Sequence, residues 1–348
     1  MIQGALLLPL LLVPARAAPA AWPYGVPSTD PYTDGFPSAD ERELFLWTNA
    51  VRVDPEAFTE FYLCSFESFG ATEQSPHDPL FLDMGLAEAG RYHSLDMAAT
   101  GNFSHSSSDG TDFATRVSWF YTDSGSVGEN IAWNYPSNWS TVIEGWMCSA
   151  GHRANIMADY NELGTGVVDA YATQDFGVGT IQTRSPVAMG AHSPVDAVYE
   201  ADFLADWLDP APPSRLQVVV DGQRLDLALA YGTELRGVFA ATVKLEALDC
   251  HDYWFAYETA DGQSGAFPEA GVYTFGPGCT DGVGWVAAGG GNGGDGGIII
   301  PGSDGDSEDV PDLADPRLVG CSSTPGRGGL LGLAWALGLA AGLRRRPR

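Results

Sequence analysis

Apolar residues at helical spacing define the first element that the chain predicts. A capping box begins at Ser38, and Leu44, Trp47 and Val51 follow on one helical face until the Asp-Pro pair at 54–55. The residue before a proline disfavours helical backbone, so the pair ends or kinks the helix. The pattern therefore predicts an amphipathic helix from residue 38 to about residue 54.

Two more helices and two strands are predicted before residue 185. A helix over about 79–100 has Leu86, His93 and Met97 on one face and Gly101 as its stop. Val142 and Trp146, four residues apart, indicate a third, short helix. Apolar runs over 163–168 and 177–182 predict strands. This order of elements over 38–185 predicts an α+β fold, a three-layer α-β-α sandwich.

The pattern changes after the proline-rich segment 209–214, which we interpret as a boundary. Short alternating or β-branched runs between Asp-Gly turns predict strands over 216–220, 224–229, 237–245, 253–258 and 273–275. They predict a small all-β sandwich-like domain over 212–283, a spacer or adhesion module. The Gly- and Asp-rich residues 287–316 predict a flexible acidic linker.

Both ends of the chain indicate export. Residues 1–17 contain an apolar core and a small-x-small site at Ala15–Ala17, typical of a signal peptide, although the first residues have no positive charge. At the other end, Cys321 is followed by an apolar run over 328–343 and an arginine cluster. This run is shorter than the roughly 20 residues that span a bilayer comfortably.

The net charge limits the possible partners, and the cysteines indicate possible disulfides. The net charge of −28 repels phosphate backbones, which excludes nucleic acid as a partner. Export permits disulfides, and position suggests Cys64 with Cys148 and Cys250 with Cys279, while a free thiol at Cys64 or Cys148 stays open. Cys321 is the odd cysteine.

The candidate chemistry lies in three Gly- and Ser-rich stretches, which we interpret as turns. They are FSHSSSDG with His105, GENIA with Glu129, and GWMCSAGHRANIM with His152. Neutral imidazoles and a carboxylate are ligands that zinc prefers, and three of them leave its fourth position open. His93, on an apolar helix face, is expected to be structural.

These three stretches resemble the signature of the CAP superfamily, the cysteine-rich secretory, antigen 5 and pathogenesis-related proteins, and in particular its bacterial secreted branch. Asn49 and Arg52 match the N-x-x-R of CAP first helices. The resemblance implies that His105, Glu129 and His152 lie together in a cleft, where a second acid completes a tetrad in the animal and plant relatives. This chain has no acid between Trp146 and His152, and Glu144 is a weak substitute. The resemblance therefore implies a site of three residues in this chain, His105, Glu129 and His152.

Two functions remain open. The first is a binding module whose cleft holds a divalent metal, a small ligand such as a lipid, or a protein surface. The second is a zinc-dependent hydrolase in which Glu129 is the general base. The trio may equally be structural, its members hydrogen-bonded to one another. Ser104, Ser106 and Cys148 lie near histidines, but adjacency alone does not make a triad. The missing fourth acid favours binding over catalysis.

The C-terminal segment 321–348 resembles the MYXO-CTERM sorting tail of surface proteins. This resemblance implies that the tail is cleaved and that Cys321 is the attachment point, with lipid modification as one form of attachment. A plain tail anchor is the alternative. In both cases the folded part is secreted or displayed at the cell surface, and contact with membrane is expected only through the tail or Cys321.

Overall fold

The computed structural model describes residues 37–123, 125–134, 139–180, 185–196, 200–244, 250–269, 271–275 and 285–286. The predicted signal peptide, acidic linker and sorting tail, with Cys279 and Cys321, lie outside these ranges. Among the described residues no helix is both long and apolar enough to cross a membrane.

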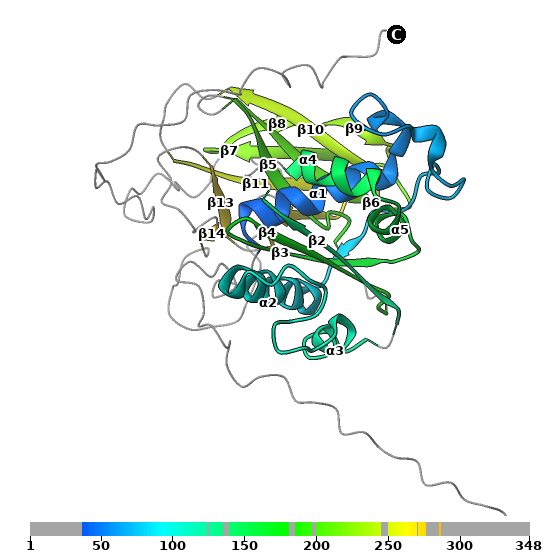
Figure 1. Ribbon diagram of the computed structural model, residues 1–348. Helices are drawn as coiled ribbons and strands as arrows, with labels where there is room; N and C mark the ends of the chain where they lie inside the picture. The colour runs from blue at the N-terminus through cyan, green and yellow to red at the C-terminus, as the bar shows by residue number, and fades with distance from the viewer. Residues whose placement is uncertain are drawn as a thin grey trace, which may run out of the picture.

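The first unit is a four-stranded sheet between two layers of helix (Figure 1). The sheet order is β1-β3-β4-β2, with β1 parallel to β3 and the other pairs antiparallel. The strands are β1 (Phe81–Leu82), β2 (Val127–Trp133), β3 (Glu162–Val168) and β4 (Tyr171–Gly177). The helices are α1 (Ala39–Val53), α2 (Met84–Thr100), α3 (Phe113–Val117), α4 (Trp139–Cys148) and α5 (Ala150–Ile156), with short 3-10 turns over Pro55–Phe58 and Phe66–Ser68. The predicted α-β-α sandwich is confirmed.

Helix ends follow the local sequence closely. The Ser38 hydroxyl and the Glu41 carboxylate exchange hydrogen bonds with each other's backbone N–H groups, so the capping box predicted for α1 is confirmed. α2 begins at Met84 rather than near residue 79, because the Asp83 carboxylate caps it by accepting from Leu86 N at 2.9 Å. Gly101 ends this helix in a left-handed conformation with φ of 71°, as predicted.

The strand predicted over 177–182 is wrong. β4 runs over Tyr171–Gly177 and pairs with β3 through a tight turn at Asp169, whose φ is 52°. An Asp in left-handed backbone allows this hairpin without a glycine, so the usual turn signal is missing. Nothing in the prediction placed a strand at β2, because GENIA reads as a turn.

The second unit consists of two antiparallel sheets that face each other. The first has the order β5-β6-β10-β9 and the second has the path β14-β13-β11-β7-β8, with β12 paired to β11. The strands are β5 (Gly190–Asp196), β6 (Glu200–Leu208), β7 (Arg215–Val220), β8 (Gln223–Asp226), β9 (Ala228–Gly232), β10 (Arg236–Lys244), β11 (His251–Glu258), β12 (Ser264–Phe267), β13 (Val272–Phe275) and β14 (Trp285–Val286).

The β-rich unit therefore starts at Gly190, and the proline-rich segment 209–214 is no boundary. This segment connects β6 to β7 inside the unit. Phe203 of β6 and Tyr253 of β11 meet edge to face at 4.9 Å between the two sheets. The sandwich architecture expected for 212–283 is present, but its first sheet also takes in β5 and β6.

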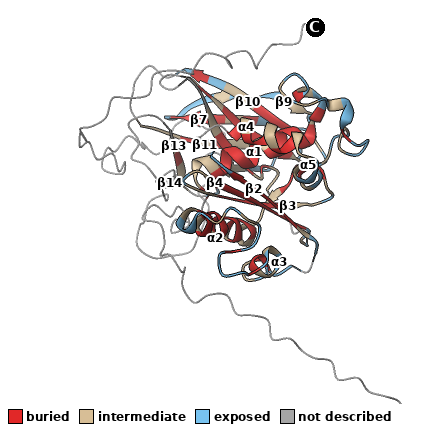
Figure 2. Ribbon diagram, in the orientation of Figure 1, coloured by how far each residue is buried: buried red, intermediate tan, exposed pale blue. Residues whose placement is uncertain are grey.

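α1 lies between the two units and is buried along most of its length (Figure 2). Arg42 donates to the Tyr253 hydroxyl at 3.1 Å, and Asn49 donates to the Asp206 carboxylate at 2.7 Å. Its other side faces β3, where Thr165 donates to Glu41 O. A single apolar cluster consequently runs from the first sheet through α1 into the β-sandwich.

The structure shows one of the two disulfides suggested by the sequence. Cys64 and Cys148 form a disulfide that ties the segment after α1 to the end of α4, as predicted. Cys250 is also disulfide-bonded, while its predicted partner Cys279 is not among the described residues.

Candidate functional site

The site centres on Glu129, which is a residue of strand β2 and not of a turn. A Cβ at its neighbour Gly128 would lie 2.6 Å from the Tyr160 hydroxyl, so a larger residue there would displace the Tyr160 side chain. The Glu129 side chain is 1% exposed. Its Oε1 lies 2.8 Å from His105 Nδ1, and its Oε2 accepts a hydrogen bond from Arg116. Both carboxylate oxygens are thus engaged.

Arg116, on α3, holds two parts of the site together. It is fully buried and pairs with Glu129, and its other terminal nitrogen donates to His105 O and to Ser107 Oγ, each at 3.1 Å. The same guanidinium therefore fixes the carboxylate and the backbone of the loop that carries His105. Sequence reasoning missed Arg116, since nothing local relates it to either residue.

His105 lies on the exposed loop after α2, as predicted. Its side chain is 52% exposed, with Nδ1 turned inward to Glu129. A histidine that meets a buried carboxylate in this way carries its proton on Nδ1. Nε2 is then left as an acceptor that faces solvent.

His152 belongs to α5, a short helix, and not to a turn. Its Nδ1 is buried and has no hydrogen-bond partner among the described residues. Burial and then the charge of His105 lower the pKa of His152, which favours the neutral imidazole at pH 7. A buried N–H without an acceptor costs more than a buried lone pair, which favours the proton on Nε2.

A network of side-chain amides joins strand β2 to helix α5. Asn155 donates to Glu129 O at 3.0 Å and to Asn130 Oδ1 at 2.9 Å. Asn130 in turn donates to His152 O at 3.2 Å. These hydrogen bonds hold α5 against β2.

A second acid lies beside Glu129, although none follows Trp146. Asp175 of β4 is the cross-strand partner of Glu129 and is completely buried. Burial and then the charge of Glu129 raise the pKa of Asp175 well above 3.8, which favours its protonated form. Correct placement of β4 opposite β2 in the sequence would have revealed this pair. Asp175 cannot act as an anionic ligand in this state.

The other residues singled out in the sequence lie elsewhere or serve the fold. His93 is fully buried on α2, where Nε2 lies 2.8 Å from Ser104 O, so its predicted structural role agrees with its surroundings. Burial lowers the pKa of His93 to about 4. Arg52 donates to backbone oxygens of Asp78 and Ala158, which makes it a structural residue too.

The geometry fits a three-ligand zinc site poorly. A metal at Glu129 would have to share its carboxylate oxygens with Arg116 and His105, each of which already occupies one of them. A metal on His152 Nε2 would leave a buried Nδ1–H without the acceptor that ligand histidines normally have. Among the described residues no group of three or more His, Cys, Asp or Glu side chains is arranged to hold a metal ion.

Comparisons with known proteins agree with the architecture. Residues 48–181 match the model of the cysteine-rich secretory protein family, CAP. An uncharacterized membrane protein of Bacillus subtilis is 39% identical over 95 residues, and the match covers 27% of each chain. The chain thus spans about a quarter of that relative's length.

Solved structures of similar proteins include two surface or extracellular proteins. An extracellular protein containing an SCP domain from Bacillus anthracis is 27% identical, covers 40% of both chains and has a TM-score of 0.31. An outer surface protein of Borrelia burgdorferi is 14% identical, covers 40% of this chain and 93% of its own, and has the same TM-score. The similarity of this chain to the cysteine-rich secretory protein (CAP) family thus extends over residues 48–181.

Proposed function

We propose that this protein is an exported CAP-domain binding module, in which the paired imidazoles of His105 and His152 hold a polar group of a ligand. One observation carries the proposal: both oxygens of Glu129 are engaged, by His105 and by the buried Arg116. The carboxylate therefore orients an imidazole and is not free to take a proton from water.

The two imidazoles offer complementary hydrogen bonds. His105 presents Nε2 as an acceptor, because its Nδ1 faces Glu129. His152 presents Nε2–H as a donor, because its Nδ1 is buried without a partner. A hydroxyl or a carboxamide can accept from one and donate to the other. Ligands with such groups are the class we expect at this site.

The extracellular and outer-surface relatives support export, as do the predicted signal peptide and sorting tail. We expect display at the cell surface, with the C-terminal tail as the attachment.

Zinc calorimetry on the full chain separates this proposal from the zinc-dependent hydrolase. We expect no stoichiometric zinc binding that depends on the imidazoles. The variants are a His105→Ala, His152→Ala double variant and a His251→Ala control in the β-rich unit. Stoichiometric binding that is lost in the double variant and kept in the control would overturn the proposal and restore the metal trio.

A positive test uses ring-nitrogen NMR with a set of small alcohols and carboxamides as probes. We expect the Nε2 signals of His105 and His152 to shift together, with His251 unchanged. If none of these probes shifts either imidazole, the site is structural and the proposed function fails.

A further inference from the structure

An exposed aromatic cluster lies beside the imidazole site. Phe103 and Trp133 are 47% and 53% exposed, and Tyr171 is half-buried. The three ring centroids lie 6.2 to 6.5 Å from one another. We call this group the aromatic platform. Contiguous exposed apolar surface of this kind marks interaction sites, because solvation of large aromatic faces is unfavourable.

The platform and the imidazole site share one face of the first sheet. Trp133 and Tyr171 are cross-strand partners at one end of the β2–β4 pair, and Glu129 and Asp175 are partners four residues away. An even separation places side chains on the same face, at about 13 Å along the strand. Phe103 precedes His105 by two residues on the same loop. The platform thus extends the surface on which His105 lies.

The surroundings of the platform select an uncharged ligand. The segments that carry it, 101–105, 127–134 and 165–175, contain no Lys or Arg, and the chain is strongly acidic. Phosphates and carboxylates are therefore disfavoured, which excludes nucleotides, whose bases would otherwise stack on these rings. The exposed neighbours Asn134 and Asp169 offer hydrogen-bonding groups at the rim.

A sugar ring matches this chemistry. Its C–H face is flat and apolar, and its hydroxyls project around the edge, where side-chain amides and carboxylates can bond them. We propose that the aromatic platform stacks against an uncharged saccharide ring of a glycan. This inference deepens the proposed function and rests on it, since the hydroxyl groups of the same glycan are what His105 and His152 would hold.

Affinity electrophoresis of the full chain tests the platform against three soluble uncharged polysaccharides: a β-1,3-glucan, a β-1,4-glucan and an α-mannan. We expect retardation by at least one of them. Trp133→Ala should weaken binding on the order of tenfold, because it removes the most exposed ring of the platform. Trp133→Phe should keep most of the affinity. Leu229→Ala, which removes an exposed apolar side chain in the β-rich unit, is the control.

The possible failures are distinguishable. No retardation by any of the three, or equal retardation of wild type and Trp133→Ala, overturns the saccharide inference. Binding to phosphatidylcholine vesicles that Trp133→Ala abolishes, without glycan binding, overturns it in favour of a lipid surface. Glycan binding that survives the His105→Ala, His152→Ala double variant but not Trp133→Ala keeps the platform and removes the imidazoles from the proposed function. The thermal midpoint of each variant checks that it is folded.

Discussion

Arg116 is the residue on which the charge balance of the site depends. It is fully buried, and Glu129 is its only ion-pair partner among the described residues. Asp175 is next to this pair, and its raised pKa favours the neutral acid, so the charge of Arg116 is balanced by that of Glu129. Removal of either charge leaves the other one buried and uncompensated.

Glu129→Ala should lower the free energy of unfolding by about 3–5 kcal/mol, because the Arg116 charge stays buried without a partner. Urea unfolding measures the difference. Glu67→Ala, which removes an exposed carboxylate far from the site, should leave the midpoint unchanged. A small effect of Glu129→Ala would mean that Arg116 reaches solvent and that the pair does not organise the site.

The two imidazoles should show opposite tautomers at neutral pH. We expect the proton of His105 on Nδ1, where Glu129 accepts it, and the proton of His152 on Nε2. Long-range proton–nitrogen NMR correlations distinguish the two forms. The Nδ1–H form of His152 would contradict the donor role assigned to this residue.

At this scale the sequence indicated the members of the site better than their roles. His105, Glu129 and His152 could be chosen because small residues surround them and because the motifs resemble a known family. Arg116 and Asp175 could not, since each acquires its function from a partner on another strand or helix. The buried ion pair of Arg116 and the cross-strand pair of Glu129 and Asp175 depend on how distant segments are placed against one another. The composition of a single stretch does not reveal this.

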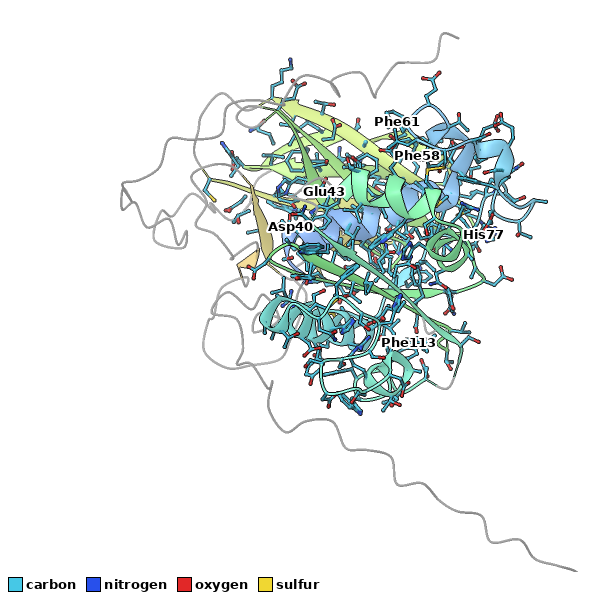
Figure 3. The ribbon with its side chains drawn as sticks, in the orientation of Figure 1. Asp40, Glu43, Phe58, Phe61, His77 and Phe113 are labelled. Atoms are coloured by element: carbon cyan, nitrogen blue, oxygen red, sulfur yellow. A yellow bond between two sulfur atoms is a disulfide. The ribbon has the colours of Figure 1, made fainter. Side chains whose placement is uncertain are left out.

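Among the elements, α1 was predicted best and contributes most to cohesion. Figure 3 marks Asp40 and Glu43 on this helix, with the β-rich sheets above and the first sheet below. Glu43 accepts hydrogen bonds from Ser193 Oγ at 2.7 Å and from Trp47 Nε1 at 3.2 Å. Burial raises the pKa of Glu43 to about 7, so this carboxyl is largely protonated below that pH.

Glu43→Gln should raise the free energy of unfolding relative to wild type, and this gain should be larger at pH 8 than at pH 5. A raised pKa contributes stability that is present below the unfolded value of 4.5 and is lost as the pH rises through about 7. The uncharged amide avoids this loss, which is on the order of 3 kcal/mol for a shift of this size. Unfolding of wild type and variant at both pH values measures it. Parallel pH profiles would show that Glu43 does not titrate in this range.

The Cys64–Cys148 disulfide closes a loop of 84 residues that contains α2, β1 and β2. In the chain-entropy account, its removal lowers stability by about 4 kcal/mol. A Cys64→Ala, Cys148→Ala variant compared with wild type under the same oxidising conditions should show this decrease in the free energy of unfolding. An unchanged unfolding midpoint would mean that the loop is already fixed by its packing.

The strands illustrate where local patterns are insufficient. β3, β7, β8, β10, β11 and β13 could be predicted from β-branched or aromatic runs between turns. β2 could not, since its Gly-Glu-Asn start reads as a turn and becomes a strand only by pairing with β4. β5 and β6 were also missed, because their residues include Pro194 and several Asp and Ala, which disfavour a strand assignment.

For the whole molecule, the shared helix matters more than the division into two units. Separate domains were expected over 38–185 and 212–283, yet α1 contributes apolar residues to one cluster that reaches both. Arg42 lies 3.5 Å from the centroid of the Tyr273 ring and also bonds Tyr253.

A fragment that ends at residue 185 should be much less stable than the full chain. It loses the strands that cover α1 and exposes side chains such as Leu46, which is 1% exposed in the full chain. Circular dichroism melting and dye binding to apolar surface would measure this. A fragment with a cooperative transition at the midpoint of the full chain would show that the CAP unit is self-sufficient.

The position of α1 also determines the order of folding events. Arg42 and its partner Tyr253 are 211 residues apart, and Asn49 and Asp206 are 157 apart. α1 is synthesised well before the strands of the β-rich unit that pack against it. Contacts between residues so far apart in the sequence form slowly. Throughout synthesis, the apolar side of α1 stays exposed to aggregation. The chain should therefore depend on a holding chaperone until its β-rich part has been delivered.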